Sequence, residues 1–178
     1  MTAFDDELWR SRATRRFMKK VAASNKGNAG ITYNRDMYSI QSLKTIIEWC
    51  STKKICVDFG KAFGGAYSSD KKLIVINGRL SPEIQLYVLM HECGHYLVGD
   101  RTAGQRYGFG YQAIGTKDEQ TIKHRIDVID EELEAWARGL KLAKRLDVKI
   151  DIDRFSQTRS EYIVSYLKWA LKIDDYVL

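Results

Sequence analysis

The sequence predicts an α+β protein that is mostly helical, with a small antiparallel β-sheet packed on one central helix. Three observations lead to this fold class. Several long segments carry apolar residues at steps of three and four, as amphipathic helices do. Two short segments, 55–59 and 71–76, carry alternating or β-branched apolar residues, as strands do. The chain has 178 residues, 44% of them hydrophobic, which is enough for one core.

The N-terminal segment 1–30 is expected to be a basic helix followed by a loop. Apolar residues at every fourth position predict the helix over 4–24: Trp9, Ala13, Phe17 and Val21. Six basic residues crowd the same helix: Arg10, Arg12, Arg15, Arg16, Lys19 and Lys20. Segment 25–34 is rich in glycine and asparagine and predicts a loop. We therefore expect a domain over 31–178, which makes one compact unit with the segment before it.

A second helix and a hairpin are expected next. The helix is predicted over 37–51, with an inner side made of Ile40, Leu43, Ile46, Ile47 and Cys50. Residues 55–59 alternate between apolar and polar, so a strand begins there. Segment 63–69 contains a glycine pair and ends in turn-prone residues, so a hairpin with 73–76 is expected.

The central helix is predicted from Ser81 to Gly99. Ser81-Pro82-Glu83 is a helix start, because serine caps free amides, proline suits the first turn and glutamate complements the helix dipole. The residues from Ile84 to Val98 are mostly apolar on every side, which predicts a buried helix. Gly99 can end it.

This helix carries the pattern His91-Glu92-Cys93-Gly94-His95, which holds two of the three histidines in the chain. Two histidines four residues apart lie one above the other on a helix, so both imidazoles can bind one zinc ion. Glu92 can then accept a proton from the water that the zinc activates. Cys93 points away from both histidines and is expected to pack in the core. The pattern predicts His91 and His95 as zinc ligands and Glu92 as the catalytic residue.

A catalytic zinc needs a third protein ligand, and the predicted helix within 117–147 supplies the candidates. Its apolar residues mark the expected buried stripe: Ile122, Ile126, Ile129, Leu133, Trp136 and Leu140. Glu132 falls roughly 80° from the middle of this stripe, whereas Glu131 falls about 180° and His124 about 160° away, both toward solvent. Glu132 is therefore the predicted third ligand. Glu131 and His124 stay as alternatives, because a break near Asp127 would rotate the first part of the helix.

Three flanking segments are expected to shape the site. The hairpin could offer an exposed strand edge, at 64–67 or at 73–76, to an extended peptide, although its glycines suit an ordinary turn equally well. The aromatic run 107–111 could cover the cleft, offer a tyrosine hydroxyl to an oxyanion, or be a surface loop. A last helix near 158–172 is expected to pack behind the site. Its expected inner face is made of Ile163, Tyr166, Leu167 and Ala170.

The run from Leu89 to Leu97 resembles the zinc helix of the ImmA/IrrE-type metallopeptidases, a gluzincin-like group. The second signature of that family is a glutamate followed three residues later by alanine and then by asparagine or aspartate. Glu132 and Ala135 are similar to it, but Trp136 replaces the polar residue.

This departure leaves Asp100 or Asp130 to serve as the polar partner beside the metal ligands. The resemblance extends over roughly 55–142 and implies a zincin-like fold, a Zn²⁺ cofactor and hydrolysis of a protein or peptide substrate. Members are often carried by phages and mobile elements, and several act on a transcriptional repressor.

The composition favours a cytoplasmic protein. The N-terminus is acidic and has no apolar signal core, and no apolar run is long enough to cross a membrane. Three cysteines without paired spacing suit a reducing compartment. The net charge of +6 and the basic first helix allow nucleic-acid contact, but no known nucleic-acid module is present. The alternative to a peptidase is a non-catalytic zinc-binding regulator that acts by binding a protein or a nucleic acid.

Overall fold

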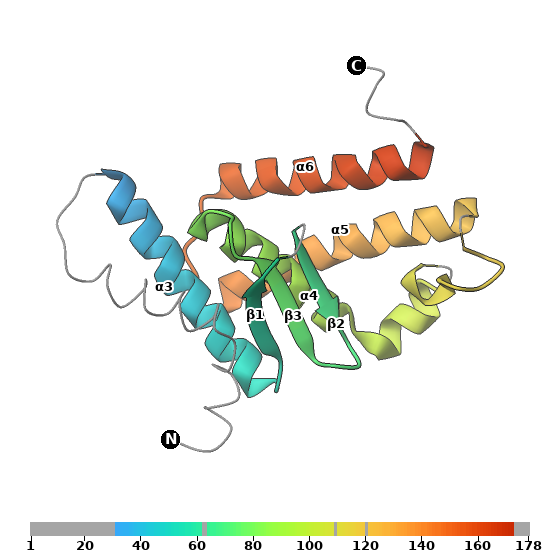
Figure 1. Cartoon of the computed structure of the whole chain (residues 1–178), viewed down its shortest axis with the longest axis horizontal. Helices are drawn as coiled ribbons and strands as arrows, with labels where there is room; N and C mark the ends of the chain where they lie inside the picture. The colour runs from blue at the N-terminus through green and yellow to red at the C-terminus, as the bar shows by residue number, and fades with distance from the viewer. Residues whose placement is uncertain (1–30, 62–63, 109, 120, 173–178) are drawn as a thin grey trace.

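The computed structural model describes residues 31–61, 64–108, 110–119 and 121–172 (Figure 1). Its helices and strands, in chain order, are α3 (Ile31–Thr52), β1 (Cys56–Gly60), β2 (Gly65–Ser68), β3 (Leu73–Asn77), α4 (Pro82–Arg106), the 3₁₀ helix η1 (Tyr111–Ala113), α5 (Ile122–Arg145) and α6 (Ile152–Leu171). The architecture is α+β and mostly helical, as predicted. The predicted basic helix over 4–24 lies outside the described residues.

The three strands form one mixed sheet in the order β1–β3–β2, so the prediction of an antiparallel sheet is only partly right. Strands β2 and β3 form the predicted antiparallel hairpin, with Gly65 opposite Ile76. Strand β1 instead runs parallel to β3, with Cys56 beside Leu73. The chain leaves β1, crosses to the far edge of the sheet as β2 and returns as the middle strand β3, which therefore runs parallel to β1.

Helix α3 begins at Ile31, so residues 31–34, which were expected in a loop, are helical. Its inner side is the predicted one, with Ile40 partly buried and Leu43, Ile46, Ile47 and Cys50 fully buried. One core cluster joins this side to α4 and to the inner face of the sheet. The sheet contributes Val57, Phe59, Ile74 and Ile76.

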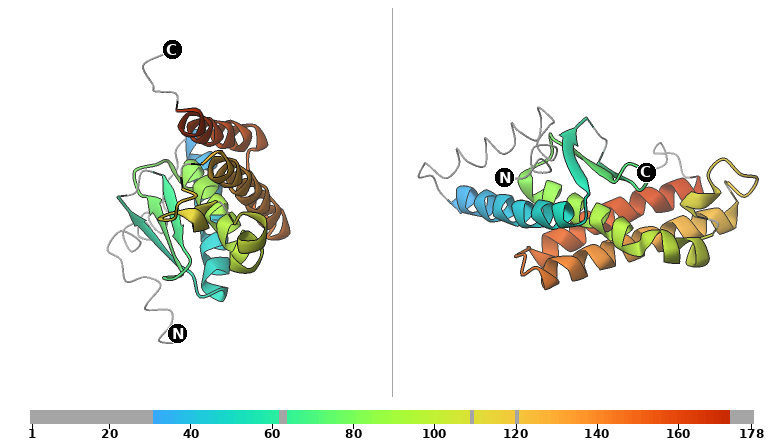
Figure 2. Two further views of the ribbon diagram at one scale, coloured as in Figure 1. Left: turned by 90° about the vertical axis from the view of Figure 1, so that its right-hand side faces the viewer. Right: turned by 90° about the horizontal axis from the view of Figure 1, so that it is seen from below.

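Helix α4 runs through the centre of the molecule (Figure 2). The Ser81 hydroxyl accepts a hydrogen bond from the Ile84 amide at 3.4 Å, as the predicted start requires. Every residue from Gln85 to Gly94 is buried. The predicted end at Gly99 is a break, since Gly99 has φ 72° and ψ 148°, and the helix then resumes as far as Arg106. Such a positive φ suits glycine.

Helices α4 and α5 cross at very close range. A Cβ added at Gly94 would lie 1.9 Å from the Ala135 carbonyl oxygen, and one added at Gly139 would lie 2.3 Å from the Met90 carbonyl oxygen. Real Cβ atoms essentially never approach another atom within 3.0 Å. Glycine at both positions therefore allows α5 to pack directly on the face of α4 that carries the two histidines.

Helix α6 lies along α5 and begins at Ile152, earlier than predicted (Figures 1 and 2). The Asp151 carboxylate caps it by accepting a hydrogen bond from the Arg154 amide at 3.2 Å. Phe155 anchors this helix, because its ring packs edge-on against both Tyr87 and Trp136. Within the described ranges, no helix has both the length and the apolar character that crossing a bilayer requires.

Candidate metal centre

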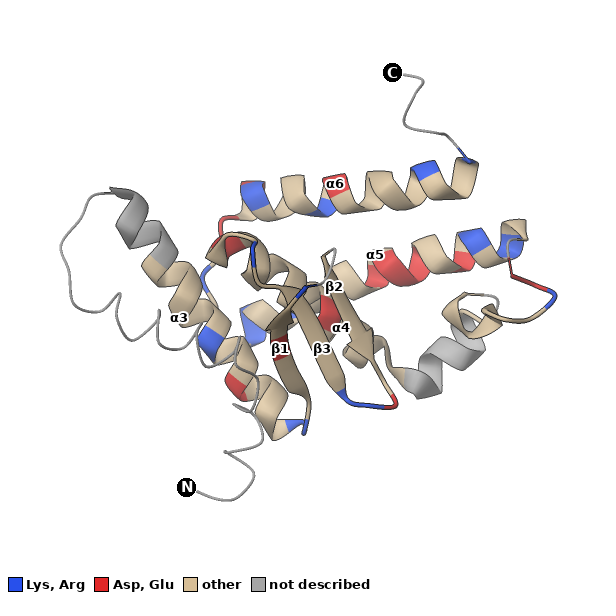
Figure 3. Cartoon of the chain, in the orientation of Figure 1, with Lys and Arg blue, Asp and Glu red and all other residues tan. Residues whose placement is uncertain are grey.

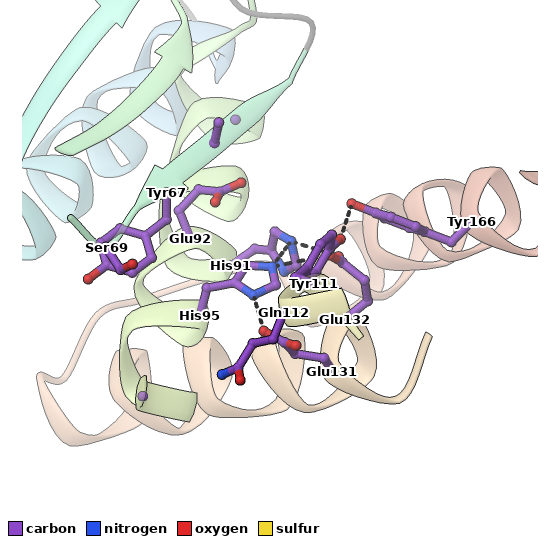
Figure 4. A pocket seen from close by; sticks show the side chains of 13 residues that line it. Tyr67, Ser69, His91, Glu92, His95, Tyr111, Gln112, Glu131, Glu132 and Tyr166 are labelled. Carbon is purple, nitrogen blue, oxygen red and sulfur yellow. Dashed lines mark hydrogen bonds and ion pairs between the residues drawn. The ribbon is translucent and has the colours of Figure 1, made fainter. Parts of the chain in front are cut away.

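His91 and His95 lie one turn apart on α4, and their Nε2 atoms face Glu132 of α5 (Figure 4). The two Nε2 atoms are 3.2 Å apart. Glu132 Oε2 lies 3.1 Å from His91 Nε2, and Glu132 Oε1 lies 3.3 Å from His95 Nε2. Two imidazole nitrogens and one carboxylate thus converge, and they belong to the three residues that the sequence predicts as zinc ligands.

The spacing of these atoms fits a metal ion. Two ligands at about 2.0–2.1 Å from a tetrahedral zinc lie roughly 3.3 Å from one another, close to the 3.2 Å between the two Nε2 atoms. One ligand atom from each of the three residues lies within 4.8 Å of the other two. Glu132 Oε2 is buried, and its contact with His91 Nε2 at 3.1 Å does not have the geometry of a hydrogen bond. A cation held between the ligands would satisfy this buried carboxylate oxygen. The buried group of His91, His95 and Glu132 could therefore hold a metal ion.

The carboxylates around His95 control its protonation. Burial lowers the pKa of His95, but its hydrogen bonds to Glu131 and Glu132 outweigh burial and raise this pKa to about 10. Burial acts to raise the pKa of Glu132, but its contacts with His91 and His95 outweigh burial and hold it well below its usual range. These shifts favour a protonated His95 beside an ionised Glu132 in the metal-free protein, so metal binding would release a proton.

The buried face of α5 differs from the predicted apolar stripe. Ile122 and Ile126 of that stripe are 74% and 53% exposed. The buried residues are instead His124, Val128, Glu131, Glu132, Ala135, Trp136, Gly139, Leu142 and Ala143. Glu132 lies near the middle of this face and not at its border. The helix is turned in this way because Ala135 and Gly139 must face α4 for the two helices to cross.

Glu131, which was expected to face solvent, is buried beside the site. Its Oε1 lies 3.6 Å from Nδ1 of His95, the ring nitrogen on the other side from the one that faces Glu132. A carboxylate in this place fixes the tautomer and the orientation of a metal-binding histidine. The geometry therefore puts Glu131 behind His95 and outside the three converging groups.

His124 was also expected to face solvent, but it is buried, although α5 runs without a break from Ile122 to Arg145. Its Nδ1 donates to the Gly110 carbonyl oxygen at 3.0 Å. Its ring also meets the Trp169 ring edge-on, with centroids 5.7 Å apart. His124 therefore joins the segment before η1 to α5 and α6, and it is not one of the converging groups.

Trp136 packs on His91. The two rings are stacked, with centroids 4.4 Å apart and planes 23° apart. His91 Nδ1 and Trp136 Nε1 are both buried, and neither has a hydrogen-bond partner among the described residues. Of the expected polar partners, Asp130 is exposed and lines a separate cavity with Tyr107, and the side chain of Asp100 lies outside the described part. The indole face of Trp136 therefore orients His91 by packing, in place of the hydrogen bond from a polar partner that was expected.

Two tyrosines border the site on the side of η1 and α6 (Figure 4). The Tyr111 hydroxyl donates to Oε1 of Glu132 and lies 3.3 Å from the Tyr166 hydroxyl. Burial raises the pKa of both phenols, so both are protonated at neutral pH. The sequence indicated a tyrosine of 107–111 near the site. The sequence put Tyr166 on the inner face of a helix behind the site, but nothing in it indicated that the hydroxyl reaches the metal ligands.

Glu92 lies against strand β2. Burial raises the pKa of its carboxyl, and the nearby histidines and a backbone hydrogen bond from Tyr67 oppose this rise. A Cβ added at Gly65 would lie 2.6 Å from Glu92 Oε1, so the absence of a side chain there allows the strand to pass beside the carboxylate. A carboxyl in this position can accept a proton and return it.

A cleft of about 510 Å³ joins these groups. It is lined by Gly65, Ala66, Tyr67, Ser69, His91, Glu92, His95, Gly99, Tyr111, Gln112, Glu131, Glu132 and Tyr166. Strand β2 is an edge of the sheet and supplies one wall. Acidic residues gather over the middle of α5 (Figure 3), which favours a cation in the cleft.

The cysteine inside the histidine pattern packs as predicted. Cys93 is fully buried, and its sulfur lies 3.4 Å from the sulfur of Cys50 on α3. Burial raises the pKa of the Cys93 thiol. Cys93 therefore ties α4 to the core and is not one of the converging groups.

Comparison of the chain with protein-family models, with curated proteins and with solved structures finds no match. The residues of the site therefore carry the functional argument.

Proposed function

We propose that this protein is a zinc-dependent peptidase that hydrolyses peptide bonds in a protein substrate. One observation carries the proposal: His91, His95 and Glu132 converge in a cleft that also holds Glu92 and the edge strand β2. The resemblance of the histidine helix to the ImmA/IrrE-type peptidases supports the same function and a zincin-like fold.

The donor set supports zinc. Two imidazoles and one carboxylate are the protein ligands of several catalytic zinc sites, in which the fourth position takes water or substrate. Magnesium and calcium prefer sites made entirely of oxygen ligands. The cleft gives the converging atoms an open side.

The mechanism follows from the places of the side chains. A zinc ion held by the three ligands would lower the pKa of water and polarise a substrate carbonyl. Glu92 accepts the proton of the attacking water and passes it to the leaving amine. Glu131 holds His95 in the tautomer that leaves Nε2 for the metal. The neutral hydroxyl of Tyr166 can donate to a developing oxyanion, whereas that of Tyr111 donates to the ligand Glu132.

Strand β2 supports an extended peptide as the substrate. The Asn77 amide of β3 donates to the Gly64 carbonyl at 2.8 Å, so Gly65 and Tyr67, the alternate residues, direct backbone groups to the outer edge. The Tyr67 amide is already bonded to Glu92, which puts this edge at the cleft and leaves the backbone of Gly65 to pair with a peptide. A peptide that adds as a further strand would lie across the metal ligands. By family resemblance, a transcriptional repressor is the first natural substrate to test.

The test combines metal content with turnover. We would purify the full chain under metal-limited conditions and measure zinc by plasma mass spectrometry and cleavage of unfolded casein by gel. Wild type and Glu92→Gln should each hold about one zinc, and only wild type should cleave. His91→Ala and Glu132→Gln should lose both properties. Glu134→Gln, on the same helix but outside the cleft lining, is the matched control and should keep both.

The other outcomes separate the alternatives. A wild-type protein without zinc, even after reconstitution, would contradict the proposal. Zinc without cleavage of casein or of any repressor tested would favour the non-catalytic regulator. Cleavage by Glu92→Gln at the wild-type rate would remove Glu92 from the mechanism.

A further inference from the structure

A second cavity, of about 380 Å³, lies between η1, α5 and α6. Its walls include Ile114, Val128 and Trp169, together with the rings of Tyr111 and Tyr166. The apolar side chains that line it come from three separate segments of the chain. The mechanism proposed above assigns no role to this cavity.

Two large apolar side chains at this cavity face solvent. Ile114 is 58% exposed and Trp169 is 37% exposed. Exposed apolar side chains that gather around a hollow mark a place where an apolar ligand gains by removing them from water. The His124 ring is held against Trp169, so the indole is in a fixed place and does not need to be ordered by the ligand.

The cavity adjoins the cleft of the metal centre. Tyr111 and Tyr166 line both, so the two hollows share these rings as a common wall. The ring centroids of His95 and Tyr111 are 6.0 Å apart. An extended peptide advances about 3.3 Å per residue, so a chain that lies over the metal ligands passes this wall within roughly two or three residues.

We propose that this second cavity is a specificity pocket, which takes a large apolar side chain two or three residues from the bond that is cleaved. The inference rests on the proposed peptidase function and adds the class of substrate: an unfolded or extended segment with Leu, Ile, Met or Phe at that place. Trp169, Ile114 and Val128 contact the side chain, and Tyr111 and Tyr166 separate it from the metal.

The first test is a cleavage profile. Zinc-loaded wild type is given a complex peptide mixture, and the cut sites are mapped by mass spectrometry. Large apolar residues should be enriched at one position near the cut. Ser165→Trp fills the pocket from an exposed position on α6 and should lower cleavage of those peptides roughly tenfold or more, while peptides with a small residue there are still cut. Ser156→Trp, an exposed serine on the opposite face of α6, is the matched control and should keep the wild-type profile.

The second test does not depend on turnover. In the full-length Glu92→Gln variant, the indole NMR signal of Trp169 is assigned with Trp169→Phe among the four tryptophans. N-acetyl-phenylalanine amide should shift this signal saturably, N-acetyl-asparagine amide should not, and added Ser165→Trp should abolish the shift.

The outcomes distinguish the two proposals. A saturable shift without cleavage by wild type supports the pocket and contradicts the peptidase. Cleavage without apolar preference, together with no shift, overturns the pocket and leaves the peptidase. A Trp169 signal that moves when the protein alone is diluted would assign this face to a second copy of the chain and overturn the pocket.

Discussion

The indole of Trp136 lies flat on the imidazole of His91, with the ring centroids 4.4 Å apart. This contact holds the first histidine by packing, because His91 Nδ1 has no hydrogen-bond partner among the described residues. We predict that Trp136→Leu weakens zinc binding about tenfold, as loss of a supporting group around a metal ligand does. Trp136→Phe keeps a flat ring and should stay within about threefold of wild type. Chelator competition measures the affinity, and urea unfolding corrects for the loss of packing. Equal affinities in both variants would show that stacking does not position His91.

The carboxylate behind His95 gives a second prediction. Glu131→Gln keeps the size of the side chain but removes the charge 3.6 Å from His95 Nδ1. Zinc affinity should fall by roughly tenfold, and the ion should still bind. Glu134→Gln is the control and should leave the affinity unchanged. Complete loss of zinc, equal to that of Glu132→Gln, would instead make Glu131 a ligand.

The crossing of α4 and α5 predicts a large loss of stability for Gly94→Ala. The new Cβ would lie 1.9 Å from the Ala135 carbonyl oxygen, which is backbone and cannot turn away. The helices must separate, and we expect a loss of about 3 kcal/mol or more in the free energy of unfolding, measured with urea. Gly60→Ala is the control, because its Cβ would meet nothing closer than 3.6 Å. A loss of less than about 1 kcal/mol for Gly94→Ala would show that the crossing adjusts easily.

Tyr87 predicts a loss of stability in alkali. Burial, with Glu83 nearby, raises the pKa of this phenol above its usual value of about 10. The unfolded chain therefore releases this proton first, so the contribution to stability is full below about pH 10 and is lost as the pH rises toward the folded pKa. Its hydroxyl donates to Glu83 at 3.1 Å, so Tyr87→Phe should cost about 1 kcal/mol at pH 8.

The same variant should lose less stability than wild type between pH 9.5 and pH 11, by about 1.4 kcal/mol per pH unit at most. Urea unfolding at several pH values measures the slope of the free energy of unfolding against pH for wild type and for Tyr87→Phe. Parallel slopes would show that Tyr87 does not titrate differently in the folded and unfolded chain.

Local patterns in the sequence predicted much of this structure. The cap at Ser81 and the hairpin of β2 with β3 each depend on neighbouring residues, and both are found. Gly99 was expected to end the helix, and it interrupts the helix instead. The direction in which α5 faces could not be predicted from its apolar stripe. That direction depends on Gly94 of another helix, so it appears only when both helices are packed together.

Two features of the site that the sequence does not predict, the approach of Tyr166 and the burial of Glu131, also depend on how separate helices pack together. Tyr166 reaches the site from α6, more than fifty residues after Tyr111, and an amphipathic pattern cannot show which of its residues meets a polar group. The apolar stripe predicts that Glu131 faces solvent, whereas the buried side of α5 includes it. The parallel pairing of β1 with β3 depends on a crossover, and the spacing of the strands does not encode it.

The place of β3 in the sheet also sets the order in which the protein can assemble. In the order β1–β3–β2, the first two strands to be synthesised do not pair with each other, and both wait for the third. The strand that completes the sheet ends at Asn77, and α4 begins five residues later at Pro82. As the chain leaves the ribosome, the sheet therefore closes only when the segment that carries the histidines is about to emerge. A nascent chain truncated before β3 should expose two unpaired strands, and chaperones would recognise that stage of synthesis.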